Sequence, residues 1–189
     1  MGRGLICTLI RATELGRRAW YFDDTNAPCS QEKQALVTKE LQYALEMVQY
    51  ASSHVGDGGY FAELFAGSPD HEIPTQLIFT RIAIMLDPNN HAYEFNIQCD
   101  NGTPMCRSGN FWAHMSDTNS RMNFCDKFFI PYPDGTLDQI LTTEQRLSEG
   151  IGSVFDLRRA QRSRSGVIIH ECTHTAYATN LPGGRYATP

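Results

Sequence analysis

The chain has 189 residues, of which 41% are hydrophobic and 20% are charged, and its net charge at neutral pH is −5. These values are ordinary for one globular domain and allow a hydrophobic core of useful size. The acidic balance gives no support to nucleic acid or an anionic membrane as a partner, and the apolar runs are too short to span a bilayer.

The first predicted element is a long helix over residues 30–54, after an irregular N-terminal stretch. Its apolar residues recur at helical spacing, and Ser30 is a candidate N-cap. The Gly-rich residues 56–59 are expected to end it, and residues 75–86 predict a second helix. The two segments therefore predict a helical first half of the domain.

The middle of the chain changes to strand-like patterns. Three short strands are expected, two of them joined by a polar turn, at residues 93–98, 110–115 and 122–124. A Pro-containing loop should follow over residues 128–135. The last long helix is expected within residues 156–178.

Six cysteines, at positions 7, 29, 99, 106, 125 and 172, bear on the compartment of the protein. None of them has the Cys-x-x-Cys spacing of zinc ribbons and redox motifs. Buried free thiols are one interpretation, and a disulfide framework in a secreted protein is the favoured one. The glycosylation sequon at Asn101 gives weak further support to an extracellular location.

The segment His170-Glu171-Cys172-Thr173-His174 carries the chemistry. On a helix, its two histidines lie about one turn apart on the same face, where both can bind one zinc ion. Glu171 can then serve as general base toward a zinc-activated water. A surface helix with incidental histidines is the competing interpretation. The uncharged residues around the motif favour the metal site.

A catalytic zinc needs a third protein ligand, and no Asp, Glu, His or Cys follows His174. The third ligand is therefore expected from upstream residues, from a second fragment or chain, or from residues beyond Pro189.

Several segments together resemble the deuterolysin and peptidyl-Lys metalloendopeptidase family, the fungal aspzincins. They are the Cys29-Ser30-Gln31-Glu32 start of the long helix, Tyr93 to Cys99, Cys106, the run Asn123-Phe124-Cys125-Asp126-Lys127-Phe128-Phe129, and the His170 to His174 motif. The resemblance covers residues 28–189. It implies a zincin-like domain over this range, preceded by an N-terminal extension over residues 1–27.

The resemblance also implies roles for particular residues. His170 and His174 would be zinc ligands, Glu171 the general base, and the disulfides would join Cys29 to Cys99 and Cys106 to Cys125. Cys7 and Cys172 stay unassigned, and Cys172 is expected to be a packed core thiol rather than a metal contact. The family takes its third ligand from the Asp of a Gly-Thr-x-Asp-x-x-Tyr-Gly motif, so the chain is expected to stop just before that ligand.

Other candidate groups are expected to be structural. The arginines at 158, 159, 162 and 164 should form a solvated helix face rather than an anion site. Tyr177 should pack in the core rather than approach a substrate, and Phe111 and Trp112 should pack on the sheet.

The expected fold is α+β and zincin-like, with the long N-terminal helix and the active-site helix packed on a small, mostly antiparallel sheet. The expected function is a secreted zinc endopeptidase that cleaves protein or peptide substrates. Two alternatives compete with it: a catalytically incomplete zincin-fold protein with a binding or effector role, and a structural protein with a chance motif.

Overall fold

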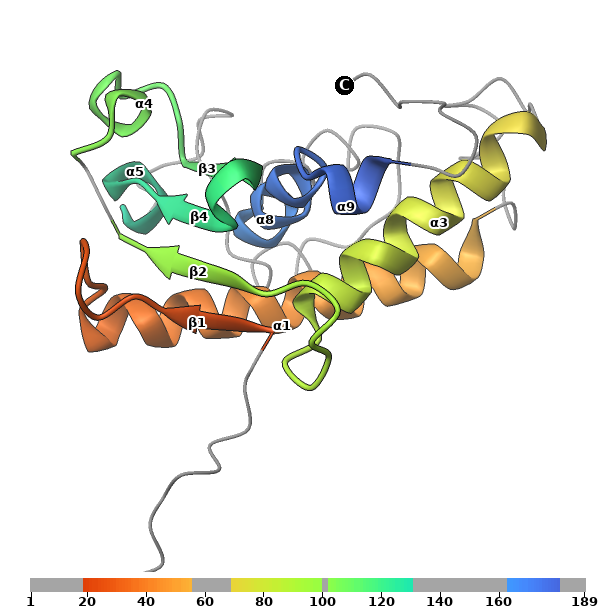
Figure 1. The fold of residues 1–189 in the computed structure, drawn as a ribbon, viewed down its shortest axis with the longest axis horizontal. Helices are drawn as coiled ribbons and strands as arrows, with labels where there is room; N and C mark the ends of the chain where they lie inside the picture. Colours follow the sequence, from red (N-terminus) through yellow and green to blue (C-terminus); the bar gives the residue numbers. More distant parts are fainter. Residues whose placement is uncertain (1–18, 56–68, 100–101, 131–162, 181–189) are drawn as a thin grey trace, which may run out of the picture.

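A computed structural model describes residues 19–55, 69–99, 102–130 and 163–180 of the chain. In chain order the elements are β1 (Trp20–Phe22), α1 (Gln31–His54), α3 (Pro69–Leu86), β2 (Phe95–Gln98), α4 (Pro104–Arg107), β3 (Ala113–Ser116), the 3-10 turn η1 (Asp117–Asn119), β4 (Arg121–Phe124), α5 (Asp126–Phe129), α8 (Arg164–Cys172) and α9 (Ala176–Thr179) (Figure 1). The protein is therefore of mixed α and β structure, as the sequence predicts.

Within the described residues, the sheet has four strands in the order β1-β2-β4-β3, and most of its pairing is parallel. β1 pairs with β2 and β2 with β4 in parallel, whereas β3 and β4 form an antiparallel hairpin. The expectation of a mostly antiparallel sheet is therefore wrong. The reason is the connection between β1 and β2, which runs through α1 and α3 and supplies the long crossover that a parallel pair requires.

Strand β1 lies in the segment assigned to an N-terminal extension. Its partner is β2, and the indole N–H of Trp20 donates to the carbonyl oxygen of Leu86 at the end of α3. The sheet thus begins before residue 28.

Helix α1 forms as the sequence predicts. The Ser30 side chain accepts a hydrogen bond from the backbone N–H of Lys33, which satisfies one of the free donors at the helix start. Its buried face holds the predicted apolar residues Val37, Leu41, Ala44, Leu45 and Val48. Helix α3 packs beside α1 and begins at Pro69, six residues earlier than expected.

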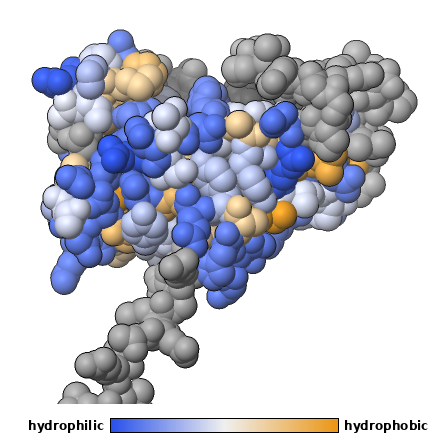
Figure 2. Space-filling model, in the orientation of Figure 1, coloured by the Kyte–Doolittle hydropathy of each residue, from blue (hydrophilic) through white to orange (hydrophobic). Residues whose placement is uncertain are grey.

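The core lies between the sheet and the helices. Phe95, Ile97, Met122 and Phe124 are fully buried on the two central strands and join one cluster with the buried faces of α1 and α8. The face of the sheet turned to the viewer in Figure 2 is covered mostly by hydrophilic side chains. No helix in the described ranges is long and apolar enough to cross a membrane.

The expected last long helix is broken near the motif. Helix α8 ends at Cys172, and α9 begins at Ala176 after a short turn. Thr175 accounts for the break, since its hydroxyl caps α9 by accepting from the N–H of Ala178 and also donates to the carbonyl oxygen of Cys172. His174 therefore sits on the turn after α8, not within the helix.

Candidate metal centre

Helix α8 is fixed at its start and along one face. The Ser163 hydroxyl caps it by accepting from the N–H of Gly166, and Val167 and Ile168 enter the core. A buried hydrogen bond of 2.7 Å from the hydroxyl of Ser165 to the carboxylate of Glu40 joins α8 to α1. These contacts set the position from which the motif side chains project.

The two imidazoles of the motif face each other. The Nε2 atoms of His170 and His174 lie 3.3 Å apart, although His174 lies beyond the helix end. The turn keeps the ring in place because the N–H of His174 donates to the carbonyl oxygen of Glu171 at 3.1 Å. Partial burial of the His170 ring, and then the neighbouring His174, lower the pKa of His170. The neutral imidazole that binds metals is therefore favoured.

The spacing of these nitrogens fits one metal ion. Two nitrogens bound to a tetrahedral zinc, each at ~2.0–2.1 Å, are about 3.3–3.4 Å apart. The observed Nε2 to Nε2 distance is 3.3 Å. Ligand atoms of His170, Glu171 and His174 all lie within 4.8 Å of one another, so this group could hold a metal ion.

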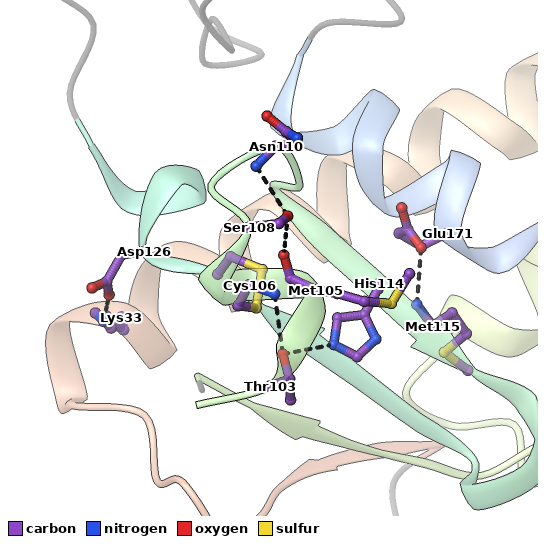
Figure 3. The surroundings of a disulfide bond; sticks show 11 residues. Lys33, Thr103, Met105, Cys106, Ser108, Asn110, His114, Met115, Asp126 and Glu171 are labelled. Carbon is purple, nitrogen blue, oxygen red and sulfur yellow. Dashed lines mark hydrogen bonds and ion pairs between the residues drawn. A yellow bond between two sulfur atoms is a disulfide. The ribbon is translucent and has the colours of Figure 1, made fainter. Parts of the chain in front are cut away.

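Glu171 is held at the rim of the sheet. It is 7% exposed, and its Oε2 accepts a hydrogen bond of 2.9 Å from the backbone N–H of Met115 on β3 (Figure 3). Burial raises the pKa of the Glu171 carboxyl to about 7, and the Met115 N–H opposes this shift. A carboxyl group that titrates near neutral pH can both take and return a proton under physiological conditions.

A pocket of about 260 Å³ opens beside the motif. It lies between helix α8 and the segment that leads into β3, and its lining residues are Asn110, Phe111, Trp112, Ala113, Val167, His170 and Glu171. The expectation for Trp112 is met, since it packs against the core. Phe111 instead is 41% exposed and lines the pocket.

Asp117 holds the turn that carries His174, and sequence reasoning missed it. Its Oδ1 accepts from the hydroxyl of Tyr93 at 3.0 Å, and its Oδ2 accepts from the backbone N–H of Ala176 at 3.1 Å. The rings of Tyr93 and Tyr177 pack 5.1 Å apart, which agrees with the packing role expected for Tyr177. No local sequence pattern could have revealed Asp117, since its partners are distant along the chain.

Two disulfides join Cys29 to Cys99 and Cys106 to Cys125. This pairing agrees with the one implied by the family resemblance. Cys172 is a buried free thiol, as expected, and burial raises its pKa. Cys7 and the sequon residue Asn101 lie outside the described residues.

Arg164 is not on a solvated face. It is 5% exposed, and its guanidinium donates to the carbonyl oxygens of Phe128 and Ile130 at 2.7 and 3.2 Å. Burial lowers the pKa of Arg164, and the negative charge of Glu40 partly offsets this effect. Arg164 therefore ties α8 to the end of α5, while the other three arginines of the predicted cluster lie outside the described residues.

The described ranges place His170, Glu171 and His174 together, and the cluster they form holds no other potential ligand from those ranges. Besides the two histidines and Glu171, the described part of the chain thus supplies no further ligand to this cluster. No protein-family model matches the chain, and no curated protein is significantly similar to it.

Proposed function

We propose that the protein is a zinc-dependent endopeptidase of zincin-like fold, related to the aspzincins and working outside the cell. The observation that carries the proposal is the 3.3 Å separation of the His170 and His174 nitrogens beside a buried carboxylate. The two disulfides support an oxidising compartment, because such bonds rarely persist in the cytosol.

Imidazole donors suit zinc as well as copper, iron and nickel, and neutral histidine is one of the preferred ligands of zinc. Zinc held there would act as a Lewis acid and lower the pKa of a bound water to about 7. His170 and His174 would hold the ion, with a third ligand from outside the described residues.

Glu171 would move the proton in the reaction. Its carboxyl has a pKa near neutrality, so it can accept a proton from the attacking water and later give it to the leaving amine. The Met115 N–H fixes one carboxyl oxygen, which orients the group between the edge strand and the two imidazoles. The 260 Å³ pocket beside Glu171 gives a substrate residue a place next to this group.

A second candidate is a metal-binding protein without catalysis. Among the described residues, the cluster contains no potential ligand other than the two histidines and Glu171, and this favours the second candidate. In that case Glu171 itself would complete the coordination and could not serve as a base.

Measurements of zinc binding and of peptide cleavage on the Glu171→Gln variant separate these two candidates. If Glu171 is the base, the variant keeps one zinc per chain and loses peptide cleavage by at least about 100-fold. His170→Ala should lose both zinc and activity. If Glu171 is a ligand, Glu171→Gln should lose zinc as well, and the wild type should cleave no peptide.

The wild-type protein is incubated with excess zinc, and the unbound ion is removed. If the protein then holds no zinc, both candidates are refuted. Exposed His54→Ala serves as a matched control, because its ring contacts Tyr50 and Ser53 on α1 rather than the motif. It should keep both zinc and activity.

A further inference from the structure

We propose that the outer face of the sheet, which is turned away from the core and from helix α8, binds a neutral carbohydrate chain. The proposal adds a second binding surface to the protein and does not depend on the peptidase function. Three observations carry it: polar side chains in register across the sheet, buried polar atoms among them that lack a partner within the described residues, and an exposed aromatic ring beside them.

The outer face follows from the alternation of side chains along a strand. The core residues of β2 and β4 alternate with polar residues, which therefore point to the opposite face of the sheet. In register across the sheet, this face carries Tyr21, Asn96, Gln98, Arg121, Asn123 and His114. It is the face turned to the viewer in Figures 1 and 2, with α1 behind the sheet. Each strand of the described sheet thus contributes a polar group to one surface.

Three atoms of the outer face are buried without a hydrogen-bond partner among the described residues. They are the Oδ1 atoms of Asn96 and Asn123 and the Nε atom of Arg121. Asn123 is only 2% exposed. Buried polar atoms in native proteins are nearly always hydrogen-bonded, and leaving them without a bond costs free energy. Their gathering on one face of the sheet points to a ligand that bonds with them.

The mixture of acceptors and donors narrows the class of ligand. Asn96 and Asn123 present acceptors, whereas Arg121 presents a donor. A carboxylate or phosphate would satisfy only the arginine, and an ammonium group would satisfy only the asparagines. A hydroxyl group both donates and accepts, so a chain of hydroxyl-bearing sugar rings can bond with all three side chains.

Tyr21 adds an apolar surface beside these polar groups. Its side chain is 52% exposed and lies next to Asn96 in register. Trp20 and Phe22, its neighbours on β1, pack on the core instead. An aromatic ring of this kind combines an apolar body with a polar tip. The C–H side of a sugar ring can pack on Tyr21 while the sugar hydroxyls reach the asparagines.

Arg121 can open the outer face to such a ligand. Its side chain is half-buried, and its partners in register, Asn96 and Ser116, carry no charge. Arg121 and Asn123 are two residues apart on β4, so their side chains project side by side from the same face. When the long side chain of Arg121 turns aside, the neighbouring amide oxygens become accessible and its guanidinium can donate to the bound sugar.

Titration calorimetry on the full chain tests the proposal. The probes are the hexasaccharides of glucose, N-acetylglucosamine and mannose, with hexagalacturonate as the charged comparison. At least one neutral hexasaccharide should bind with a dissociation constant of about 1 mM or lower, and at least about tenfold more tightly than hexagalacturonate. Absence of binding by all three neutral probes, or binding of hexagalacturonate within about tenfold of the best of them, would overturn the proposal.

Variants test whether the sugar binds on the sheet. Tyr21→Ala removes the exposed ring and Asn96→Ala removes one acceptor, and each should weaken binding of the best hexasaccharide by at least about fivefold. Tyr21→Phe keeps the ring and should stay within about twofold of the wild type. Tyr50→Ala is the matched control, because it removes an even more exposed ring from α1, and it should leave the affinity unchanged. Unchanged affinity in Tyr21→Ala, or an equal loss in Tyr50→Ala, would show that the outer face is not the site.

Two further titrations separate the outer face from the His-Glu-His motif. Glu171→Gln and removal of zinc by a chelator both alter the candidate metal centre, which lies on helix α8 at the core side of the sheet. Neither change should alter the affinity for the hexasaccharide, and a loss of binding in either would place the sugar at the motif instead. If the chain cleaves no peptide, the peptidase function fails, whereas the sugar affinity still decides this proposal.

Discussion

The carboxylate of Glu171 accepts a hydrogen bond from the backbone N–H of Met115, 2.9 Å away, and this bond joins helix α8 to the edge strand of the sheet. Burial raises the pKa of Glu171 to about 7, because the charged form loses more by leaving water than the neutral form does. When no metal is bound, ionisation of the Glu171 carboxyl therefore lowers the free energy of unfolding.

This cost predicts a pH dependence for the metal-free protein. The folded state holds the Glu171 proton to a higher pH than the unfolded chain, so the contribution of Glu171 to the free energy of unfolding falls as the pH rises between about 4.5 and 7. Glu171→Gln cannot ionise and should lack this fall. The free energy of unfolding of Glu171→Gln minus that of the wild type should therefore be ~3 kcal/mol larger above the window than below it.

Urea unfolding with a chelator present, across the window and on both sides of it, measures this difference. Glu46→Gln on the exposed surface of α1, where Glu46 accepts a hydrogen bond from Gln42, serves as the control and should keep the wild-type difference from Glu171→Gln. Parallel profiles for wild type and Glu171→Gln would mean that the carboxyl of Glu171 is hydrated in the folded protein.

Asp117 is predicted to position the second histidine. It accepts hydrogen bonds from Tyr93 and from the N–H of Ala176, two residues after His174. Asp117→Ala removes both bonds and should weaken zinc binding by about 10–100-fold, the range found for residues that orient metal ligands. Competition with a chromogenic chelator gives the affinity.

Asp87→Ala provides the matched control for Asp117→Ala. Asp87 also accepts a backbone hydrogen bond, from Asn89 at 2.9 Å, but in the turn after α3. A loss of zinc affinity confined to Asp117→Ala supports the positioning role. Equal losses in both variants would point to a general loss of stability instead.

Patterns local in the chain predicted part of the fold and of the site. The apolar period and Ser30 located α1, and the four-residue spacing of His170 and His174 brought their nitrogens together. The break after Cys172 also had a local signal that was not used: Thr175 precedes Ala176 in the manner of an N-cap.

Contacts between distant residues could not be predicted in this way. β1 is a strand of three residues that becomes recognisable only through its pairing with β2, and this pairing sets the parallel character of the sheet. Met115 bonds to Glu171 of the motif across 56 residues of sequence, and Asp117 bonds to Ala176, just after the motif, across 59 residues. Arginine usually lies on the surface, but Arg164 is buried because two backbone carbonyl oxygens at the end of α5 accept hydrogen bonds from its guanidinium.

The two disulfides are predicted to differ in how much they stabilise the fold. From their sequence separations of 70 and 19 residues, loop closure gives about 4 kcal/mol for Cys29–Cys99 and about 3 kcal/mol for Cys106–Cys125. Replacing each pair by serine and measuring urea unfolding checks the order. The larger loss of unfolding free energy is expected for the variant that lacks Cys29–Cys99, because that bond closes the longer loop.

The buried bond between Ser165 and Glu40 is predicted to hold α8 on α1. Ser165→Ala removes one hydrogen bond from a carboxylate that is 1% exposed, which should cost about 1–3 kcal/mol of unfolding free energy. Ser53→Ala removes an exposed bond to the α1 backbone and should change stability by less than about 0.5 kcal/mol. A double-mutant cycle with Glu40→Gln isolates the coupling. Additive losses would show that the two side chains stabilise the helices independently, whereas a coupling above about 0.5 kcal/mol would show that this contact anchors helix α8.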